Sequence, residues 1–83
     1  MPERLATAKA RAVGTRQTIR ALERGVAELV FVAQDAEERV VRPVLDLARR
    51  RGVPCVHVPS MSELGKHCMI NVGAAAAAIV RAE

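Results

Sequence analysis

The amino-acid sequence predicts an α/β fold, namely a three-layer α/β/α sandwich with a small mixed β-sheet. Two short runs rich in β-branched and apolar residues, 28–33 and 53–58, are typical of strands covered on both faces. Segments with helical spacing or helix-capping residues precede, separate and follow these runs, and this alternation predicts helices packed on a sheet. We expect one domain over residues 1–83, because a chain this short buries only about 60% of its unfolded surface.

The first part of the chain is predicted to hold two helices. A proline and an acid near the start are typical of a first helical turn, so a helix is expected over residues 2–13. Gly14 ends this helix, and Thr15 is suited to cap a second helix over residues 16–24. Gly25 then follows as a C-terminal glycine.

The strand at 28–33 leads into a longer helix. Asp35 is suited to cap it, and the helix is expected to begin firmly at Arg42 or Pro43, since proline is tolerated only near the first turn. It should end at the three arginines before Gly52, where cations meet the negative end of the helix dipole. The apolar stripe of this helix consists of Val41, Val44, Leu45 and Ala48.

After the strand at 53–58, Pro59 and Ser60 break the extended chain. Ser60 followed three residues later by Glu63 is a capping-box pattern, which predicts a short helix from Met61 to about His67. Residues 74–80 allow two interpretations. Five successive alanines favour a helix, whereas the alternation of elements favours a central strand with room only for small side chains.

Charge is distributed unevenly along the chain. Within residues 1–24, six cationic residues accompany two acidic ones, whereas the other 59 residues hold seven of each. This asymmetry indicates a polyanionic partner, although a solvated basic surface would have the same composition. Because Phe31 is the only aromatic residue, a reader of single-stranded RNA by base stacking is disfavoured.

The second predicted helix carries the clearest binding feature. On a helical wheel, Ile19 and Leu22 lie opposite a polar sector that holds Arg16, Gln17, Arg20 and Arg24. The helix start adds unpaired N–H groups that attract phosphate, and Gly14 lets an RNA backbone approach closely. The Gln17 amide both donates and accepts, which suits a base edge. The same pattern also fits a surface helix whose arginines face water.

A second feature is the apolar stretch at 69–73, in a predicted loop. Ile70 and Val72 can either fill the core or pack against unstacked bases at a bend in RNA.

Catalysis and metal binding are not expected. Cys55 and His57 lie on one face of a strand and should face the core, and the adjacent His67 and Cys68 lack a spacing suited to joint metal ligation. We expect no disulfide framework, no cofactor and no metal. The longest apolar run, 72–80, is too short to span a bilayer, so a cytoplasmic protein is expected.

Four segments in order, 13–18, 53–60, 63–66 and 70–75, resemble the ribosomal protein L-seven-Ae family of kink-turn RNA-binding proteins, especially its short bacterial members. The resemblance covers nearly the whole chain and implies a strand at 74–80. It also implies that the second helix enters the widened groove of a kink-turn and reads its tandem sheared G·A pairs.

The resemblance assigns guanine and backbone contacts to Arg16, Gln17 and Arg20, and contacts with an extruded nucleotide to Glu37 and Val41. The loop over the internal-loop bases matches Ile70, Asn71 and Val72. The complete candidate RNA-binding set is Gly14, Thr15, Arg16, Gln17, Thr18, Arg20, Arg24, Glu37, Val41, Ile70, Asn71 and Val72.

The expected function is therefore binding of structured RNA with a kink-turn, with ribosomal RNA as a candidate target and ribosome association as a consequence. A monomer without enzymatic activity is expected. The alternative is a protein-interaction adaptor of the same fold with no RNA ligand. Many family members carry Asn-Glu where this chain has Arg16-Gln17, lysine where it has Met61, and an acid where it has Asn71.

Overall fold

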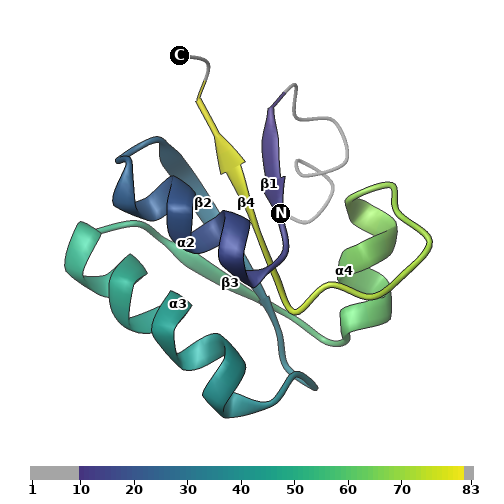
Figure 1. Cartoon of the computed structure of the whole chain (residues 1–83). Helices are drawn as coiled ribbons and strands as arrows, with labels where there is room; N and C mark the ends of the chain where they lie inside the picture. Colours follow the sequence, from purple (N-terminus) through teal and green to yellow (C-terminus); the bar gives the residue numbers. More distant parts are fainter. Residues whose placement is uncertain (1–9, 82–83) are drawn as a thin grey trace.

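The computed structural model describes residues 10–81, which form alternating strands and helices around one sheet. In chain order the elements are β1 (Arg11–Val13), α2 (Thr15–Glu23), β2 (Ala27–Ala33), α3 (Glu38–Arg51), β3 (Cys55–Val58), α4 (Met61–His67) and β4 (Ala76–Val80) (Figure 1). The strand order is β1-β4-β2-β3, with β2 and β3 parallel and the other neighbours antiparallel. The predicted α/β fold with a small mixed sheet is therefore confirmed.

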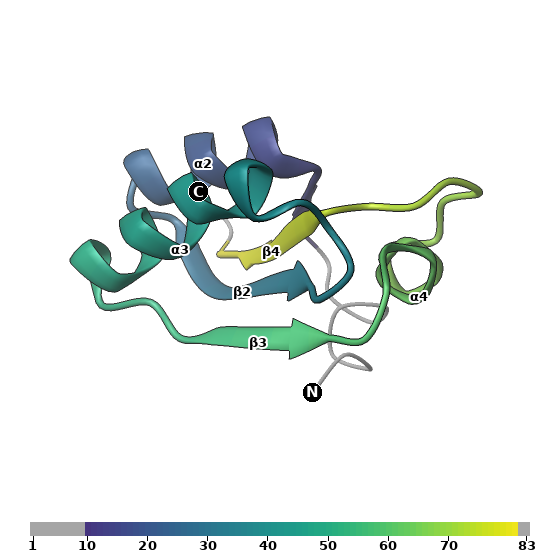
Figure 2. The ribbon, with the colours of Figure 1, turned by 90° about the horizontal axis from the view of Figure 1, so that it is seen from below.

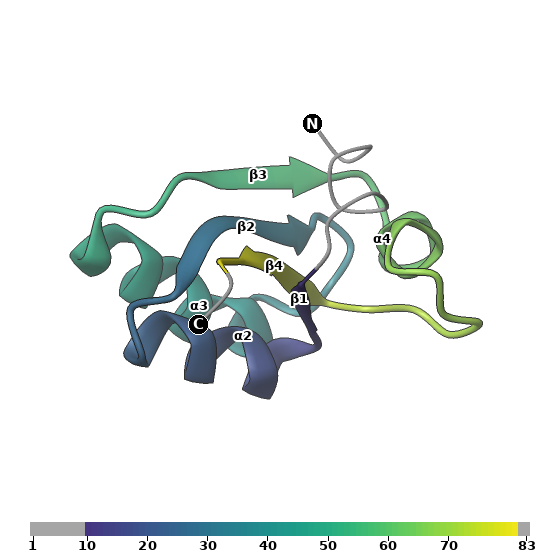
Figure 3. The same ribbon diagram turned by 90° about the horizontal axis from the view of Figure 1, so that it is seen from above.

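Helices cover both faces of this sheet. Figures 2 and 3 show α2 and α3 together on one side, with α4 separate from them near the carboxyl end of β3. Successive residues of β2 point to opposite faces, as in any strand. Val30 and Val32 pack against Val44 in one core cluster, whereas Phe31 packs against Leu64 of α4 in the other. The two clusters produce the predicted three layers.

The alanine-rich segment forms a central strand. β4 lies between β1 and β2, and Ala76, Ala77 and Ala78 are fully buried. A strand enclosed by neighbours on both edges and by helices on both faces has room for small side chains, and this packing outweighs the helix propensity of alanine. The interpretation of this segment as a strand is confirmed, although the strand covers Ala76–Val80 rather than all of residues 74–80.

The predicted first helix is wrong at its carboxyl end. Residues 2–9 lie outside the described part of the chain, but Arg11–Val13 form β1 rather than the end of a helix. β1 pairs antiparallel with β4, and Gly14 N–H extends the pairing by donating to the Ala76 carbonyl at 2.8 Å. Backbone pairing with a strand more than 60 residues later in the chain therefore decides this segment, and no local pattern reveals it.

The prediction for the start of α3 is also wrong, because the helix begins at Glu38 rather than at Arg42 or Pro43. Pro43 lies inside the helix at an exposed position, where water can solvate the carbonyl that loses its helical partner. Asp35 does not cap α3. Its Oδ1 instead accepts a hydrogen bond from the Met61 N–H at 2.8 Å, which ties the β2–α3 loop to the start of α4.

The short helix α4 has the predicted bounds. Ser60 Oγ accepts a hydrogen bond from the Glu63 N–H at 3.0 Å, which confirms the capping interaction predicted from the spacing. The preceding strand β3 is shorter than predicted, because Val53 N–H still bonds to the Ala48 carbonyl at the end of α3. Among the helices in residues 10–81, none has the length and apolar character needed to cross a bilayer.

Candidate nucleic-acid interface

Gly14 creates the start of α2. Its φ of 100° and ψ of 157° belong to a backbone region that side chains with a Cβ rarely adopt. The glycine, not Thr15, is the N-cap residue, so the predicted capping role of Thr15 is wrong. Among the described residues no side chain caps this helix end. Backbone N–H groups of the first turn are therefore available to an external acceptor.

Thr18 stabilises this helix start from the buried side of α2. Its side chain is 0% exposed, and its Oγ1 donates to the Gly14 carbonyl at 2.8 Å while its N–H donates to the same oxygen at 3.0 Å. A side chain without exposed surface cannot touch RNA without rearrangement. The expectation that Thr18 contacts RNA is therefore corrected to a positioning role for the Gly14 turn.

The outer face of α2 is polar, as the helical wheel predicts. Leu22 is buried and Ile19 is half-buried against the core that includes α3. On the opposite side, the exposed residues are Arg16, Gln17, Arg20 and Arg24. The first turn holds no acidic residue that would occupy its N–H groups or repel phosphate. The N-terminal part of α2 therefore presents two guanidinium groups and one amide beside its backbone donors.

Some residues of the apolar loop at 69–73 pack in the core, whereas others are exposed and available to contact RNA bases. Ile70 is half-buried and packs against the core cluster under α4, so its side chain belongs mainly to the core. Met69 and Val72 are each 70% exposed, and Asn71 is exposed beside them. Exposed apolar side chains of this size in a short loop suit contact with an apolar surface such as a base face.

Backbone contacts place the segment that joins this loop to β4 next to the start of α2. Gly14 N–H bonds to Ala76 at the start of β4, and Ala33 N–H at the end of β2 bonds to the neighbouring Ala75 carbonyl at 2.9 Å. The loop that precedes β4, the first turn of α2 and the segment before α3 therefore lie at one end of the sheet. Figure 2 shows this end, with the loop extending beyond α4.

Glu37 and Val41 differ in accessibility. Glu37 precedes α3 and is exposed, and its Oε2 lies 3.2 Å from Nε of Arg39. Val41 is only 7% exposed and packs in the core cluster shared with α2. Val41 thus offers little surface to a nucleotide, and Glu37 is the accessible member of this pair.

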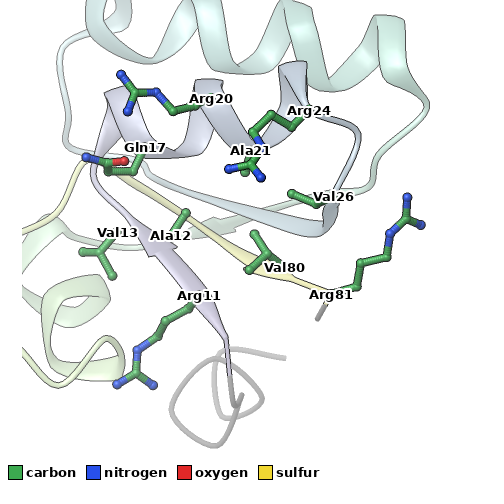
Figure 4. A pocket seen from close by; sticks show the side chains of 10 residues that line it. All are labelled: Arg11, Ala12, Val13, Gln17, Arg20, Ala21, Arg24, Val26, Val80 and Arg81. Atoms are coloured by element: carbon green, nitrogen blue, oxygen red, sulfur yellow. The ribbon is translucent and has the colours of Figure 1, made fainter. Parts of the chain in front are cut away.

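Sequence reasoning missed two arginines beside this face. A groove of about 250 Å³ separates α2 from β1 and β4, and Arg11 and Arg81 line it together with Gln17, Arg20 and Arg24 (Figure 4). Arg11 and Arg81 come from opposite ends of the described chain and both border the groove because β1 pairs with β4, although the Arg11 side chain points away from α2. No local sequence signal indicates that pairing, so the sequence alone does not single out these two residues.

The cysteines and histidines come from β3 and from the end of α4. Cys55 and Cys68 pack in different core clusters, on opposite faces of the sheet. Burial raises the pKa of both thiols, and the charge of Arg11 partly opposes this rise at Cys68. His57 is exposed on the edge strand β3 rather than facing the core as predicted. Within the described residues, no three His, Cys, Asp or Glu side chains gather to hold a metal.

Comparison with known proteins gives consistent matches. The model of the ribosomal protein L7Ae/L30e/S12e/Gadd45 family matches residues 2–83. RNA-binding protein YbxF of Geobacillus stearothermophilus is 51% identical over 69 residues, which are 83% of this chain and 84% of that protein. Large ribosomal subunit protein eL8 of Halobacterium salinarum is 44% identical over 70 residues, covering 83% of this chain and 58% of that protein. The solved 15.5kD RNA-binding protein of Giardia lamblia superposes with a TM-score of 0.79 and 29% identity, covering 99% of this chain and 69% of the other.

Proposed function

This chain belongs to the ribosomal protein L7Ae/L30e/S12e/Gadd45 family, and on that basis we propose that it binds RNA containing a kink-turn. The observation that carries the proposal is the first turn of α2. There an uncapped helix start follows Gly14, and exposed Arg16, Gln17 and Arg20 surround it. Backbone donors and guanidinium groups bind phosphate, whereas the Gln17 amide is suited to a base edge.

The apolar loop supplies the second contact in this proposal. The exposed Val72 and Met69 would cover bases that the bend leaves unstacked. Ile70 supports the loop from the core, and the polar Asn71 lies at the exposed edge. One protein monomer would therefore grip the kink from two directions, with Glu37 close to any nucleotide extruded at the same end.

A ribosomal RNA target is part of the proposal. The similar protein eL8 is named as a component of the large ribosomal subunit, which supports ribosome association of this chain in the cytoplasm. No step of the proposal needs an enzyme, a cofactor or a metal.

The test is titration of a kink-turn RNA with the wild-type protein and with the double variant Gln17→Ala, Arg20→Ala. Each lost base or backbone contact costs about 1–3 kcal/mol, so the double variant should bind at least about 30-fold more weakly. Because both side chains are exposed, its thermal unfolding should match that of the wild type within a few degrees.

The matched control is Arg50→Ala, an exposed arginine near the far end of α3, which should keep wild-type affinity. A second control replaces the tandem G·A pairs of the RNA by Watson–Crick pairs and should abolish specific binding. Equal affinity of the folded double variant would contradict the assigned site. Absence of any complex at low salt would favour the protein-interaction adaptor instead.

A further inference from the structure

The groove between α2 and the β1–β4 edge has the composition of a phosphate-binding surface. Its floor is apolar and includes Val26 and Val80, and arginines dominate its polar lining (Figure 4). None of the described residues that line it is acidic. A concave surface lined by one sign of charge over apolar walls concentrates counter-ions of the other sign, in this case anions.

The groove continues the RNA-binding face along the helix axis. Gln17 and Arg24 are seven residues apart on α2, which corresponds to about 10 Å at 1.5 Å per residue. A length of this order spans only a few nucleotides of a nucleic-acid strand. A strand bound at Gln17 and Arg20 would therefore reach the far end of the groove within a few nucleotides.

Arg81 is fixed at that far end. Its Nη2 donates to the Gly25 carbonyl at 2.7 Å, beside the carboxyl end of α2. A guanidinium has five N–H donors, and this bond uses one of them, so Arg81 is oriented and still able to bind a phosphate. Figure 4 shows Arg24 over the groove and Arg81 beside its end, whereas Arg11 points away from α2. The cationic end of the groove is thus formed by Arg24 and Arg81.

Helix capping alone does not account for this arrangement. Arg51 also binds a carbonyl at the end of α2, that of Glu23 at 3.1 Å, yet it does not line the groove. The carboxyl end of α2 therefore has a second arginine for its carbonyls. Arg81 differs from Arg51 in lining the groove, at whose end it lies beside Val80.

We propose that this groove holds the sugar-phosphate backbone of an RNA stem that leaves the kink along α2, with Arg81 as its outermost contact. The inference rests on the proposed kink-turn binding and extends it to a second, sequence-independent contact. An RNA stem is favoured over an acidic protein because the groove is continuous with Gln17 and Arg20 of the proposed RNA site.

The experiment compares a short kink-turn RNA with RNAs in which each stem in turn is lengthened by several base pairs. Wild-type protein should bind one of the longer RNAs about three- to fivefold more tightly, the scale of one or two exposed ion pairs. Its salt dependence on that RNA should steepen by about 0.9 in log–log slope per added phosphate contact.

Two variants separate this contact from the kink contact. Arg81→Gln removes the outer cation, and Val26→Glu places a carboxylate in the half-buried floor. Both should lose the gain from the longer stem and bind the short RNA like the wild type. Arg50→Gln, which removes one exposed charge outside the groove, should keep the gain. Circular dichroism would establish that each variant is folded.

The outcomes are distinguishable. If the wild type binds the short RNA but gains nothing from either longer stem, or if Arg81→Gln keeps the gain, the groove proposal is overturned while kink-turn binding stands. Preferential, Arg81-dependent binding of poly-glutamate over the stem would assign the groove to an acidic protein and also overturn it. Failure of the wild type to bind any kink-turn RNA would overturn both proposals.

Discussion

Gly65→Ala should destabilise this protein although it replaces a glycine inside a helix. Gly65 is buried in α4, where the chain folds back so that the 69–73 loop lies on the helix. A Cβ at this position would lie 2.1 Å from the Val72 carbonyl oxygen and 3.3 Å from Gly73 Cα. The obstacle is backbone, which cannot turn aside as the end of a side chain can.

The magnitude follows from two opposing contributions. Alanine in a helix interior is favoured over glycine by about 1 kcal/mol. Against this, the Val72 carbonyl must move by at least about 1 Å to reach ordinary contact distance, and overpacking of this kind costs about 1–3 kcal/mol. The loop resists the shift because Ile70 N–H bonds to the Gly65 carbonyl at 3.1 Å and Ala74 N–H bonds to the Met61 carbonyl at 3.0 Å. Because the clash is with backbone at 2.1 Å, the cost should lie in the upper part of that range, about 2–3 kcal/mol, and we expect a net loss of about 1–2 kcal/mol.

Thermal unfolding followed by circular dichroism measures this loss. At about 4–8 °C per kcal/mol for a small domain, the midpoint should fall by about 5–15 °C. Ser62→Ala is the matched control, because it introduces alanine at an exposed position of the same helix and should not lower the midpoint. Displacement of Val72 should also weaken binding of kink-turn RNA. A Gly65→Ala midpoint equal to or above that of the wild type would refute the steric reasoning.

Two further predictions concern buried and half-buried side chains. Thr18→Val removes the hydroxyl that donates to the Gly14 carbonyl, and it should lower the free energy of unfolding, measured in urea, by about 1 kcal/mol. Thr15→Val, at the start of the same helix, is the control and should change this free energy by less than about 0.5 kcal/mol. Equal effects of the two variants would argue against the buried hydrogen bond. Burial raises the pKa of Cys55 and Cys68 in the folded state, so both thiols stay protonated at pH values where the unfolded chain ionises. The contribution of the two thiols to the free energy of unfolding should therefore be complete below the ordinary thiol pKa and should decrease as the pH rises above it. Alkylation of the thiols, followed by mass spectrometry, should be faster in denaturant than in the folded protein. Equal alkylation rates would contradict the burial argument.

Local chemistry accounts for the parts of the fold that the sequence predicts well. The α4 helix begins where Ser60 and Glu63 indicate, because a capping interaction involves residues only three positions apart. The polar and apolar sides of α2 are likewise predictable, since helical periodicity alone decides which residues share a face. For the same reason the helical wheel correctly places Arg16, Gln17 and Arg20 on the exposed side of α2.

Features that depend on distant partners are not predictable in this way. The local sequence at Arg11–Val13 is typical of the end of a helix, but these residues form a strand because they pair with β4. Asp35 precedes a helix and resembles its cap, but the Met61 N–H, 26 residues later, is the donor it meets. Thr18 directly follows the exposed Arg16 and Gln17, yet its hydroxyl is buried and donates to the Gly14 carbonyl. In each case the hydrogen bonds of the folded chain override a plausible local interpretation.

The central position of β4 explains why the separate parts of the candidate site lie together. Because β4 pairs with both β1 and β2, its first residues adjoin the Gly14 turn on one edge and the end of β2 on the other. The exposed loop that leads into β4 must therefore end beside the first turn of α2, whatever its own sequence. The alanines of β4 allow helices to pack closely on both faces, so that α2 lies directly over the strand. The position of this strand, rather than any local pattern, thus determines that the start of α2 and the segment leading into β4 lie at the same end of the sheet.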